Sequence, residues 1–162
     1  MQILFGIGYT SPSEDACLRA HHDTLMYEWA CTNDKLILIA GHTHRPIWSS
    51  MTHLERLLLE LRMLQQIRPP QPIPLNYNEE VARLKKEIAE RYEKTPPCDD
   101  TIKIEPSYFN TGCCSFSDGD ITGIEIAHGQ IRLIKWGAND SGEITRKVLE
   151  HSPLTEVFDA LA

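Results

Sequence analysis

Residues 36 to 48, with the sequence LILIAGHTHRPIW, contain the features that decide the fold. The first five of these residues are apolar and predict a buried strand. Gly41 allows an abrupt turn at the end of that strand, and His42 and His44 follow with one residue between them. Pro46 prevents a helix or a central strand from starting directly after the histidines. We therefore expect a loop at a strand end that carries two imidazoles.

These two histidines are candidate metal ligands. Neutral imidazoles bind Zn, Mn, Fe or Ni, and residues two apart in an extended segment point the same way. The alternative is a pair of histidines in a solvent-exposed loop, which the surrounding apolar strand, glycine and proline disfavour. His21 and His22 are instead expected to be helical residues, one half-buried and one in solvent, because adjacent helix positions diverge.

The composition indicates a soluble globular chain with one ordinary domain, or a core with an insertion. The 162 residues are 41% hydrophobic and 24% charged. The formal net charge of -7 argues against a surface for nucleic acid or an anionic membrane. We find no apolar run near the roughly 20 residues that span a bilayer, and no signal-peptide pattern. Five cysteines without a C-x-x-C pair predict reduced thiols in a cytoplasmic protein.

Hydrophobic spacing predicts helices on both sides of the strand. A helix capped by Ser11 or Ser13 is expected to run to about residue 30. Two amphipathic helices, over residues 52–64 and 79–92, flank a proline-rich turn and predict an inserted αα-hairpin within residues 49–98. The first is more apolar than self-pairing requires, which favours a homo-oligomer formed through this hairpin. The expected apolar face of the earlier helix consists of Cys17, Leu18, His21, Leu25, Met26 and Trp29.

The C-terminal part of the chain predicts β structure. Short strands are expected at residues 101–105 and 108–112, followed by a three-stranded antiparallel meander over 121–127, 130–136 and 143–149. His128 and Gly129 suit a two-residue hairpin turn. Ser152 and Pro153 are expected to begin a last short helix. The expected fold class is therefore α/β (α+β), in a single domain over residues 1–162.

Two stretches of the sequence resemble the calcineurin-like metallophosphoesterases. The GHTH sequence followed by Arg45 and Pro46 is similar to the last metal-binding motif of that family. Residues 108–114, YFNTGCC, resemble the Asn-Pro-Gly-Ser strand end that follows this motif, with Thr for Pro and Cys for Ser. The strands over residues 121–136 resemble the closing hairpin of the family. The resemblance covers about residues 35–48 and 106–137, and the helical hairpin lies between them.

The resemblance implies a partial metallophosphoesterase-type β-sandwich with flanking helices and a dinuclear metal site at its strand ends. It implies hydrolysis of a phosphate-ester substrate by a water that bridges two divalent metal ions, which could be Mn, Fe, Zn or Ni. By the same resemblance, His42 would bind the second metal and His44 the first. The residues implied to lie beside these ligands are Gly41, Thr43, Arg45 and Asn110.

The sequence lacks the ligands that the family places before GHxH. It contains no Asp-x-His and no Gly-Asn-His, and residues 119–123 begin like Gly-Asp-x-x-Asp but end in Gly, after GHTH and in an expected turn. Only 41 residues precede His42. We therefore expect the C-terminal portion of a longer hydrolase, either a fragment or an internally initiated product. We expect it to be inactive by itself, because two imidazoles without a carboxylate do not hold two divalent metals.

Two other interpretations stay open at the level of sequence. The chain could be a non-enzymatic module that folds, binds at most one metal weakly and associates through the Leu54–Leu64 stripe. It could also be a metal-binding protein completed by another chain, with His21 or His22 contributing. The roles of Cys113 and Cys114 are not defined by the sequence, beyond that of small buried strand residues.

Overall fold

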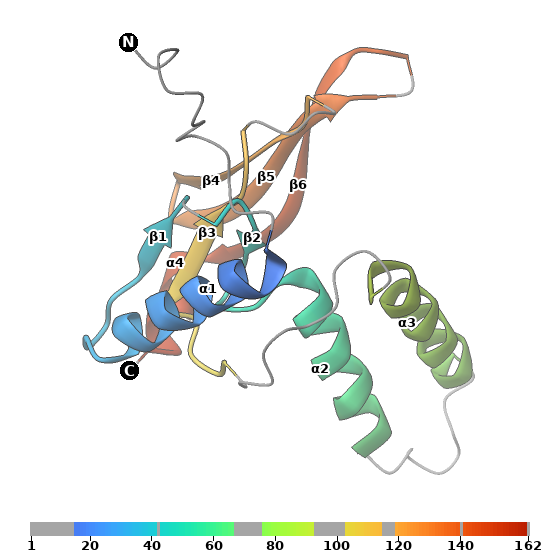
Figure 1. Ribbon diagram of the computed structural model, residues 1–162, viewed down its shortest axis with the longest axis horizontal. Coiled ribbons are helices and arrows are strands. Elements are labelled where there is room, and N and C mark those ends of the chain that lie inside the picture. Colours follow the sequence, from blue (N-terminus) through green and yellow to red (C-terminus); the bar gives the residue numbers. More distant parts are fainter. Residues whose placement is uncertain are drawn as a thin grey trace.

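The computed structural model describes residues 15–41, 43–66, 76–92, 103–114, 119–139 and 141–161. Within these ranges the chain is a mixed α+β protein, as the sequence predicts, and it has two three-stranded sheets (Figure 1). The helices are α1 (Ala16–Cys31), α2 (His53–Gln66), α3 (Tyr77–Tyr92) and α4 (Leu154–Asp159). The strands are β1 (Leu38–Ala40), β2 (Pro46–Ile47), β3 (Tyr108–Thr111), β4 (Ile121–Ala127), β5 (Gln130–Ala138) and β6 (Ile144–Pro153).

The first sheet has the order β1-β3-β2, with β3 in the centre. Strand β1 runs parallel to β3, and β2 runs antiparallel to it with Pro46 opposite Thr111. Pro46 is tolerated because it is the first residue of an edge strand, where its missing N–H is not required. The prediction that the strand before Gly41 is buried was wrong, since Ile39 is 39% exposed. The reason is that β1 is also an edge strand of this small sheet.

The second sheet is the antiparallel meander that the sequence predicts, in the order β4-β5-β6. His128 and Gly129 form its first turn with φ values of 52° and 72°, the left-handed pair that a two-residue hairpin prefers. Strand β6 extends beyond the expected residue 149 to Pro153, so α4 begins one residue after that proline. The strand predicted at residues 101–105 was wrong over its described part, because residues 103–105 form no strand.

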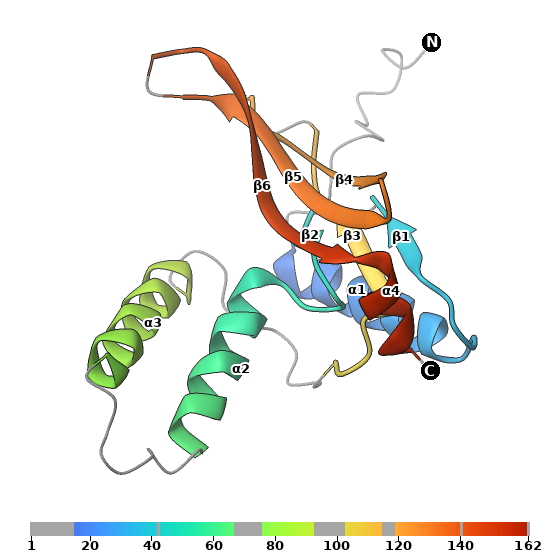
Figure 2. The same cartoon turned by 180° about the vertical axis from the view of Figure 1, so that it is seen from behind.

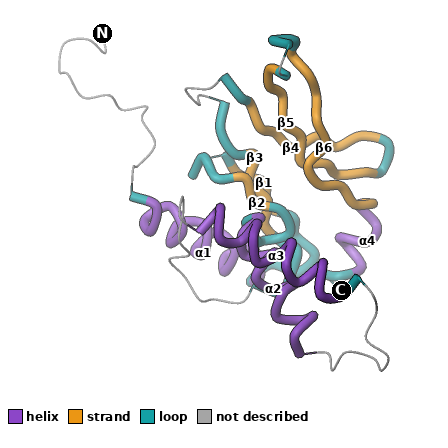
Figure 3. Tube along the Cα trace, turned by 90° about the vertical axis from the view of Figure 1, so that its right-hand side faces the viewer, coloured by secondary structure: helices purple, strands orange, loops and turns teal. Residues whose placement is uncertain are grey.

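The two sheets pack together around a small apolar core. Its buried residues are Trp48, Phe109, Ile131, Leu133 and Val157. The rings of Trp48 and Phe109 meet edge to face, with centroids 5.2 Å apart, a favourable arrangement for aromatic pairs. Figure 3 shows the resulting layers: α1 lies on one side of the first sheet, and β4, β5 and β6 lie on the other. Strand β3 therefore lies between a helix and a second sheet.

Helix α1 presents small and polar side chains to the first sheet. Asp15 caps it by accepting hydrogen bonds from the backbone N–H groups of Cys17 (2.9 Å) and Leu18 (3.1 Å). The expected caps, Ser11 and Ser13, lie outside the described residues. The buried residues are Ala20, Asp23, Thr24 and Ala30, and the predicted apolar face was wrong because Leu18, Leu25, Met26 and Trp29 are 41–54% exposed. The helix turns its polar side inward because it meets the polar strand ends described below.

Helices α2 and α3 lie side by side and project away from the two sheets (Figure 2). Thr52 and Glu55 form a reciprocal capping box at the start of α2, with bonds of 2.5 Å and 3.2 Å. Leu57 is the buried residue of α2 and Leu84 that of α3, whereas Leu54, Leu58, Leu61 and Leu64 are half-buried. The proline-rich turn predicted between the helices lies outside the described residues. No helix in the described ranges is both long and apolar enough to cross a bilayer.

The cysteines only partly match the expectation of reduced thiols. Cys31, Cys113 and Cys114 are free, and Cys17 is disulfide-bonded. The expectation was therefore wrong for Cys17.

Candidate functional site

The loop that joins β1 to β2, called the histidine loop below, lies at the same edge of the first sheet as the end of β3. The two strands are parallel, with Ala40 opposite Asn110, so their carboxyl ends face the same way. A Cβ atom at Gly41 would lie 2.9 Å from the side-chain oxygen of Thr111. Real Cβ atoms do not approach so closely, so Gly41 is needed for the close approach of the loop to β3.

His44 occupies a backbone conformation that is unusual for a residue with a side chain. Its φ is 57°, in the left-handed region. Its ring atom Nδ1 lies 2.9 Å from the Sγ atom of Cys113, which is 3% exposed. The imidazole therefore reaches the residue that replaces Ser in the resemblance to the family. His42, the other predicted ligand, lies outside the described residues.

Asn110 connects the end of β3 to the histidine loop. It is fully buried, and its Nδ2 donates hydrogen bonds to the hydroxyl oxygens of Thr43 and Tyr108, each at 2.9 Å. Its Oδ1 accepts a bond from the backbone N–H of Gly112 at 3.0 Å. The structure thus brings together two of the predicted site residues, Thr43 and Asn110. Both amide hydrogens of Asn110 are used to hold the loop and the strand.

Asp23 on α1 is the residue of this cluster that the sequence analysis missed. It is 1% exposed, and its Oδ1 accepts hydrogen bonds from the hydroxyls of Thr43 (2.7 Å) and Tyr108 (2.8 Å). Its Oδ2 pairs with the guanidinium of Arg45 at 3.2 Å. Asp23 is not one of the residues of the predicted apolar face of α1, so helical periodicity gave no indication that it is buried. A carboxylate with three side-chain partners is what burial of such a charge requires.

The environment of Asp23 controls the protonation of the cluster. Burial raises the pKa of Asp23, and the hydrogen bonds from Thr43 and Tyr108 and the charges of Arg45 and Lys103 oppose that rise. Burial also raises the pKa of Tyr108 well above its usual range, and the nearby charge of Asp23 acts in the same direction. Tyr108 therefore stays protonated and serves as a hydrogen-bond donor to the carboxylate.

The described residues do not by themselves form a dinuclear metal centre. Among them there is no group of three or more His, Cys, Asp or Glu side chains placed to hold a metal ion. His44 fits the role of a single ligand, because Nδ1 faces Cys113 and Nε2 is the nitrogen that would bind a metal. A protein site for Zn uses three or four ligands. The described donors are therefore too few for such a site.

One of His21 and His22 is half-buried and the other exposed, as predicted, but the exposed one is His21, which was expected on the apolar face of the helix. His21 is exposed and His22 is half-buried, and both lie on α1. Neither belongs to a group of three or more potential ligands within the described ranges. The interpretation in which either histidine completes the metal site thus gains no support from the described residues.

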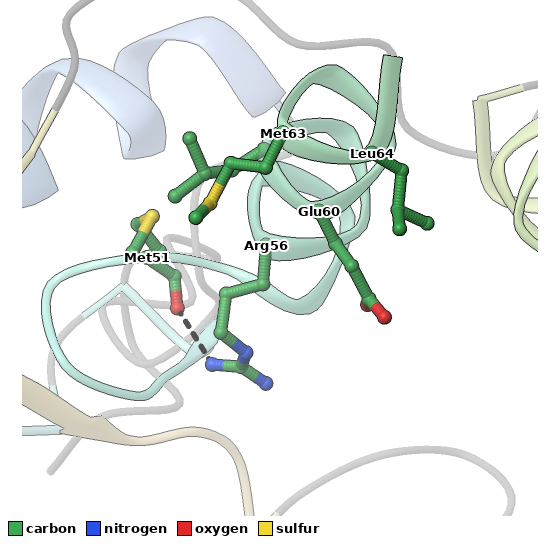
Figure 4. A pocket seen from close by; sticks show the side chains of 6 residues that line it. Met51, Arg56, Glu60, Met63 and Leu64 are labelled. Carbon is green, nitrogen blue, oxygen red and sulfur yellow. Dashed lines mark hydrogen bonds between the residues drawn. The ribbon is translucent and has the colours of Figure 1, made fainter. Parts of the chain in front are cut away.

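A groove of about 420 Å³ lies along α2, away from the histidine loop (Figure 4). Arg56 lies at one end, where its guanidinium donates to the backbone oxygen of Met51 at 3.2 Å and also pairs with Glu150 of β6. The lining residues are Met51, Arg56, Leu59, Glu60, Met63 and Leu64. The residues of the predicted site are absent from this lining, so the groove is a separate feature.

Comparison of the chain with protein-family models, with curated proteins and with solved structures finds no match.

Proposed function

We propose that this chain carries the GHxH portion of a metal-dependent phosphoesterase centre. In this proposal His42 and His44 are ligands of divalent metal ions, and the remaining ligands come from polypeptide outside this sequence. One observation carries the proposal. The two stretches that resemble the family are far apart in sequence but touch in space, through the bond between Thr43 and Asn110 and the contact between His44 and Cys113.

In such a centre, the described residues of this chain would hold the metal-binding histidine in place. Bound metals would supply the Lewis acidity and the activated water of a phosphoesterase. The residues of this chain would fix the imidazole of His44 through its contact with Cys113, and would hold the loop against β3 through Thr43 and Asn110. The partial metallophosphoesterase-type sandwich is the architecture that we propose for the two packed sheets. The expected location is the cytoplasm, with a phosphate ester as substrate and neither membrane nor nucleic acid as partner.

The proposal predicts that the isolated chain hydrolyses little or no phosphate ester, because its sequence lacks the carboxylate motifs of the family. The assay is hydrolysis of p-nitrophenyl phosphate and bis-p-nitrophenyl phosphate with added Mn²⁺. His42→Ala is the control variant, and it should have the same background rate as the unmodified chain. Robust turnover that His42→Ala abolishes would show that the chain is a complete enzyme.

Residual metal binding is tested separately. The chain should bind Zn²⁺ or Mn²⁺ weakly in a calorimetric titration, and a variant with both His42→Ala and His44→Ala should bind less. Equal binding by the two proteins would contradict the role of the histidine loop as a ligand source, whatever the result of the hydrolysis assay.

A second candidate function is association through the hairpin without catalysis. The groove along α2 is lined mainly by apolar side chains, and Met63 within it is 54% exposed. A homo-oligomer that covers this groove is the corresponding proposal. Sedimentation equilibrium over a range of concentrations tests it, with Met63→Lys as the disrupting variant. A monomer at the highest concentration would rule out this interface.

A further inference from the structure

The two carboxylate oxygens of Asp23 bind the two residues that flank His44. Oδ1 accepts the hydroxyl of Thr43 at 2.7 Å, and Oδ2 accepts the guanidinium of Arg45 at 3.2 Å. The carboxylate on α1 therefore forms hydrogen bonds with the loop on both sides of one histidine. His44, between these two residues, has the left-handed φ of 57°. Such a conformation persists at a non-glycine residue only where its surroundings impose it.

A residue of β3, Asn110, also holds Thr43 in place. The hydroxyl of Thr43 donates to Asp23 and accepts from Asn110 at 2.9 Å. It cannot rotate without breaking one of these two bonds. Tyr108 also donates to Oδ1 of Asp23 at 2.8 Å and accepts from Asn110. The carboxylate is thus fixed to the central strand, and the loop is fixed to the carboxylate.

We propose that Asp23 is a positioning residue that holds His44 in its left-handed conformation, with the imidazole against Cys113. The consequence for metal binding rests on the proposed function, because it requires His44 to be a ligand. The consequence for the conformation of His44 does not. The hydrogen bonds of Asp23 go to Thr43, Arg45 and Tyr108, and it acts on His44 through Thr43 and Arg45.

A merely structural role would predict something different. If Asp23 only fastened α1 to the sheet, its replacement would lower stability and leave the surroundings of His44 unchanged in the folded protein. A positioning role requires the imidazole of His44 to change its tautomer balance or its contact with Cys113 while the fold persists. The distinguishing readout is therefore the state of the His44 ring.

The experiment records the side-chain nitrogen signals of the histidines by NMR in the full chain without metal, with His44→Gln to assign the His44 signals. The variant is Asp23→Asn, which keeps an acceptor for Thr43 but presents no second carboxylate oxygen to Arg45. The matched control is Asp34→Asn, at an exposed aspartate after α1. We expect His44 signals shifted toward a mixture of both tautomers in Asp23→Asn, and unchanged signals in Asp34→Asn.

Two substitutions at Thr43 separate the hydroxyl from the shape of the side chain. Thr43→Val removes the bond to Asp23 and should shift the His44 signals, whereas Thr43→Ser keeps the hydroxyl and should retain them. If Asp23→Asn does not fold, the His44 signals of these variants and of Arg45→Gln test the positioning role instead. Wild-type His44 signals in folded Asp23→Asn, or in folded Thr43→Val and Arg45→Gln, would overturn the proposal.

Zn²⁺ affinity, measured by competition with a chelating dye, is the second readout. Loss of a group that orients a ligand lowers metal affinity by about 10- to 100-fold, so we expect Asp23→Asn to bind Zn²⁺ about 10-fold more weakly than Asp34→Asn. If no protein binds Zn²⁺ but the His44 signals respond to Asp23→Asn, the positioning role stands and the proposed function fails. If Zn²⁺ binds through His44 equally well in both variants and the ring signals do not move, the positioning role fails alone.

Discussion

The Sγ atom of Cys113 lies 2.9 Å from Nδ1 of His44, although 69 positions separate the two residues in the sequence. The contact joins the histidine loop after β1 to the turn after β3. It gives the candidate site a sulfur atom where the resembled family has a hydroxyl.

The two neighbouring cysteines should differ in their rates of alkylation. Cys113 is 3% exposed, whereas Cys114 is an exposed residue. We expect iodoacetamide to modify Cys114 rapidly and Cys113 only through local opening of the structure. Mass spectrometry of the peptide that contains both residues measures the two rates. The two cysteines should react alike in urea, and equal rates in the folded protein would contradict the burial of Cys113.

Gly112 should be much less tolerant of alanine than Gly142. Both glycines have left-handed φ values, 83° and 81°. A Cβ atom at Gly142 meets nothing within 4 Å, so Gly142→Ala should cost about 1 kcal/mol from backbone strain alone. A Cβ atom at Gly112 would collide with the side-chain oxygen of Thr122 and lie 2.9 Å from Pro46. We expect a loss of about 3 kcal/mol for Gly112→Ala.

Urea unfolding of both alanine variants measures this difference. Because the two backbone conformations match, the excess for Gly112→Ala reports the collision. Thr122 accepts a hydrogen bond from the backbone N–H of Cys113 at 3.0 Å, so its displacement would also disturb that cysteine. Equal costs at the two positions would mean that β4 does not pack against the turn after β3 as described.

Removal of the Tyr108 hydroxyl should destabilise the protein without creating a large cavity. Tyr108→Phe takes one donor from Asp23 and one acceptor from Asn110, both of which are buried. Buried groups that lose a partner cost about 1–3 kcal/mol. Tyr92→Phe, at a 49% exposed tyrosine on α3, is the control and should change stability by less than about 0.5 kcal/mol. Chemical denaturation of the two variants is the measurement, and similar stabilities would argue against the buried network.

His53 should make a small contribution to stability that depends on pH. Its Nε2 lies 2.9 Å from Glu87 of α3, and its Nδ1 lies 3.8 Å from Glu150 of β6. The carboxylate of Glu150, which attracts the imidazolium, is the main cause that raises the pKa of His53 above 6.5. Glu87 acts in the same direction, and burial and the charges of Arg91 and Arg56 oppose the rise. His53 in turn lowers the pKa values of Glu150 and Glu87 below 4.5. The imidazole thus links the hairpin to the second sheet.

The signs of these shifts define a pH window. The contribution of charged His53 is fully present below its unfolded pKa of 6.5 and disappears as the pH rises through its higher folded value. The contributions of the glutamates are present above their unfolded value of 4.5 and disappear as the pH falls through their lower folded values. We expect His53→Gln to cost about 0.5 kcal/mol between these limits, the usual size for exposed ion pairs.

Urea unfolding of the wild type and His53→Gln at several pH values measures this contribution. The difference in free energy of unfolding should be largest near pH 5.5 and should vanish at pH 9. The control variant is His21→Gln, at an exposed histidine of α1. A difference that grows above pH 7 would have the wrong sign for the proposed ion pairs.

The parts of the fold that depend on residues close together in the sequence could be predicted from it. The meander β4-β5-β6 follows from alternating apolar residues and from the turn at His128 and Gly129. The hairpin helices follow from the spacing of their apolar residues. The buried side of α1 could not be predicted in this way, because periodicity counts apolar residues and Asp23 faces a polar partner that only the folded chain supplies.

The candidate site was predictable only in part for the same reason. The resemblance selected Thr43 and Asn110, which meet in the structure. Cys113 was identified only as a replacement for Ser, and its contact with His44 depends on how the end of β3 meets the loop. Asp23 has no motif around it in the sequence. Its place in the site depends on Thr43, Arg45 and Tyr108, which come from separate segments of the chain and bond to its carboxylate only in the folded protein.

The hydrogen bonds around Asp23 also determine when the site can form during folding. Asp23 and Tyr108 are 85 positions apart, and Thr43 and Asn110 are 67 apart. Closing such long loops costs chain entropy before any contact repays it. The meander and the α2–α3 pair need only short loops to close. The α2–α3 hairpin lies between β1 and β3 in the sequence, and once folded it shortens the flexible chain that must still close. We therefore expect the histidine loop to be ordered last, and to be the first region whose amide hydrogens exchange with solvent when the protein begins to open.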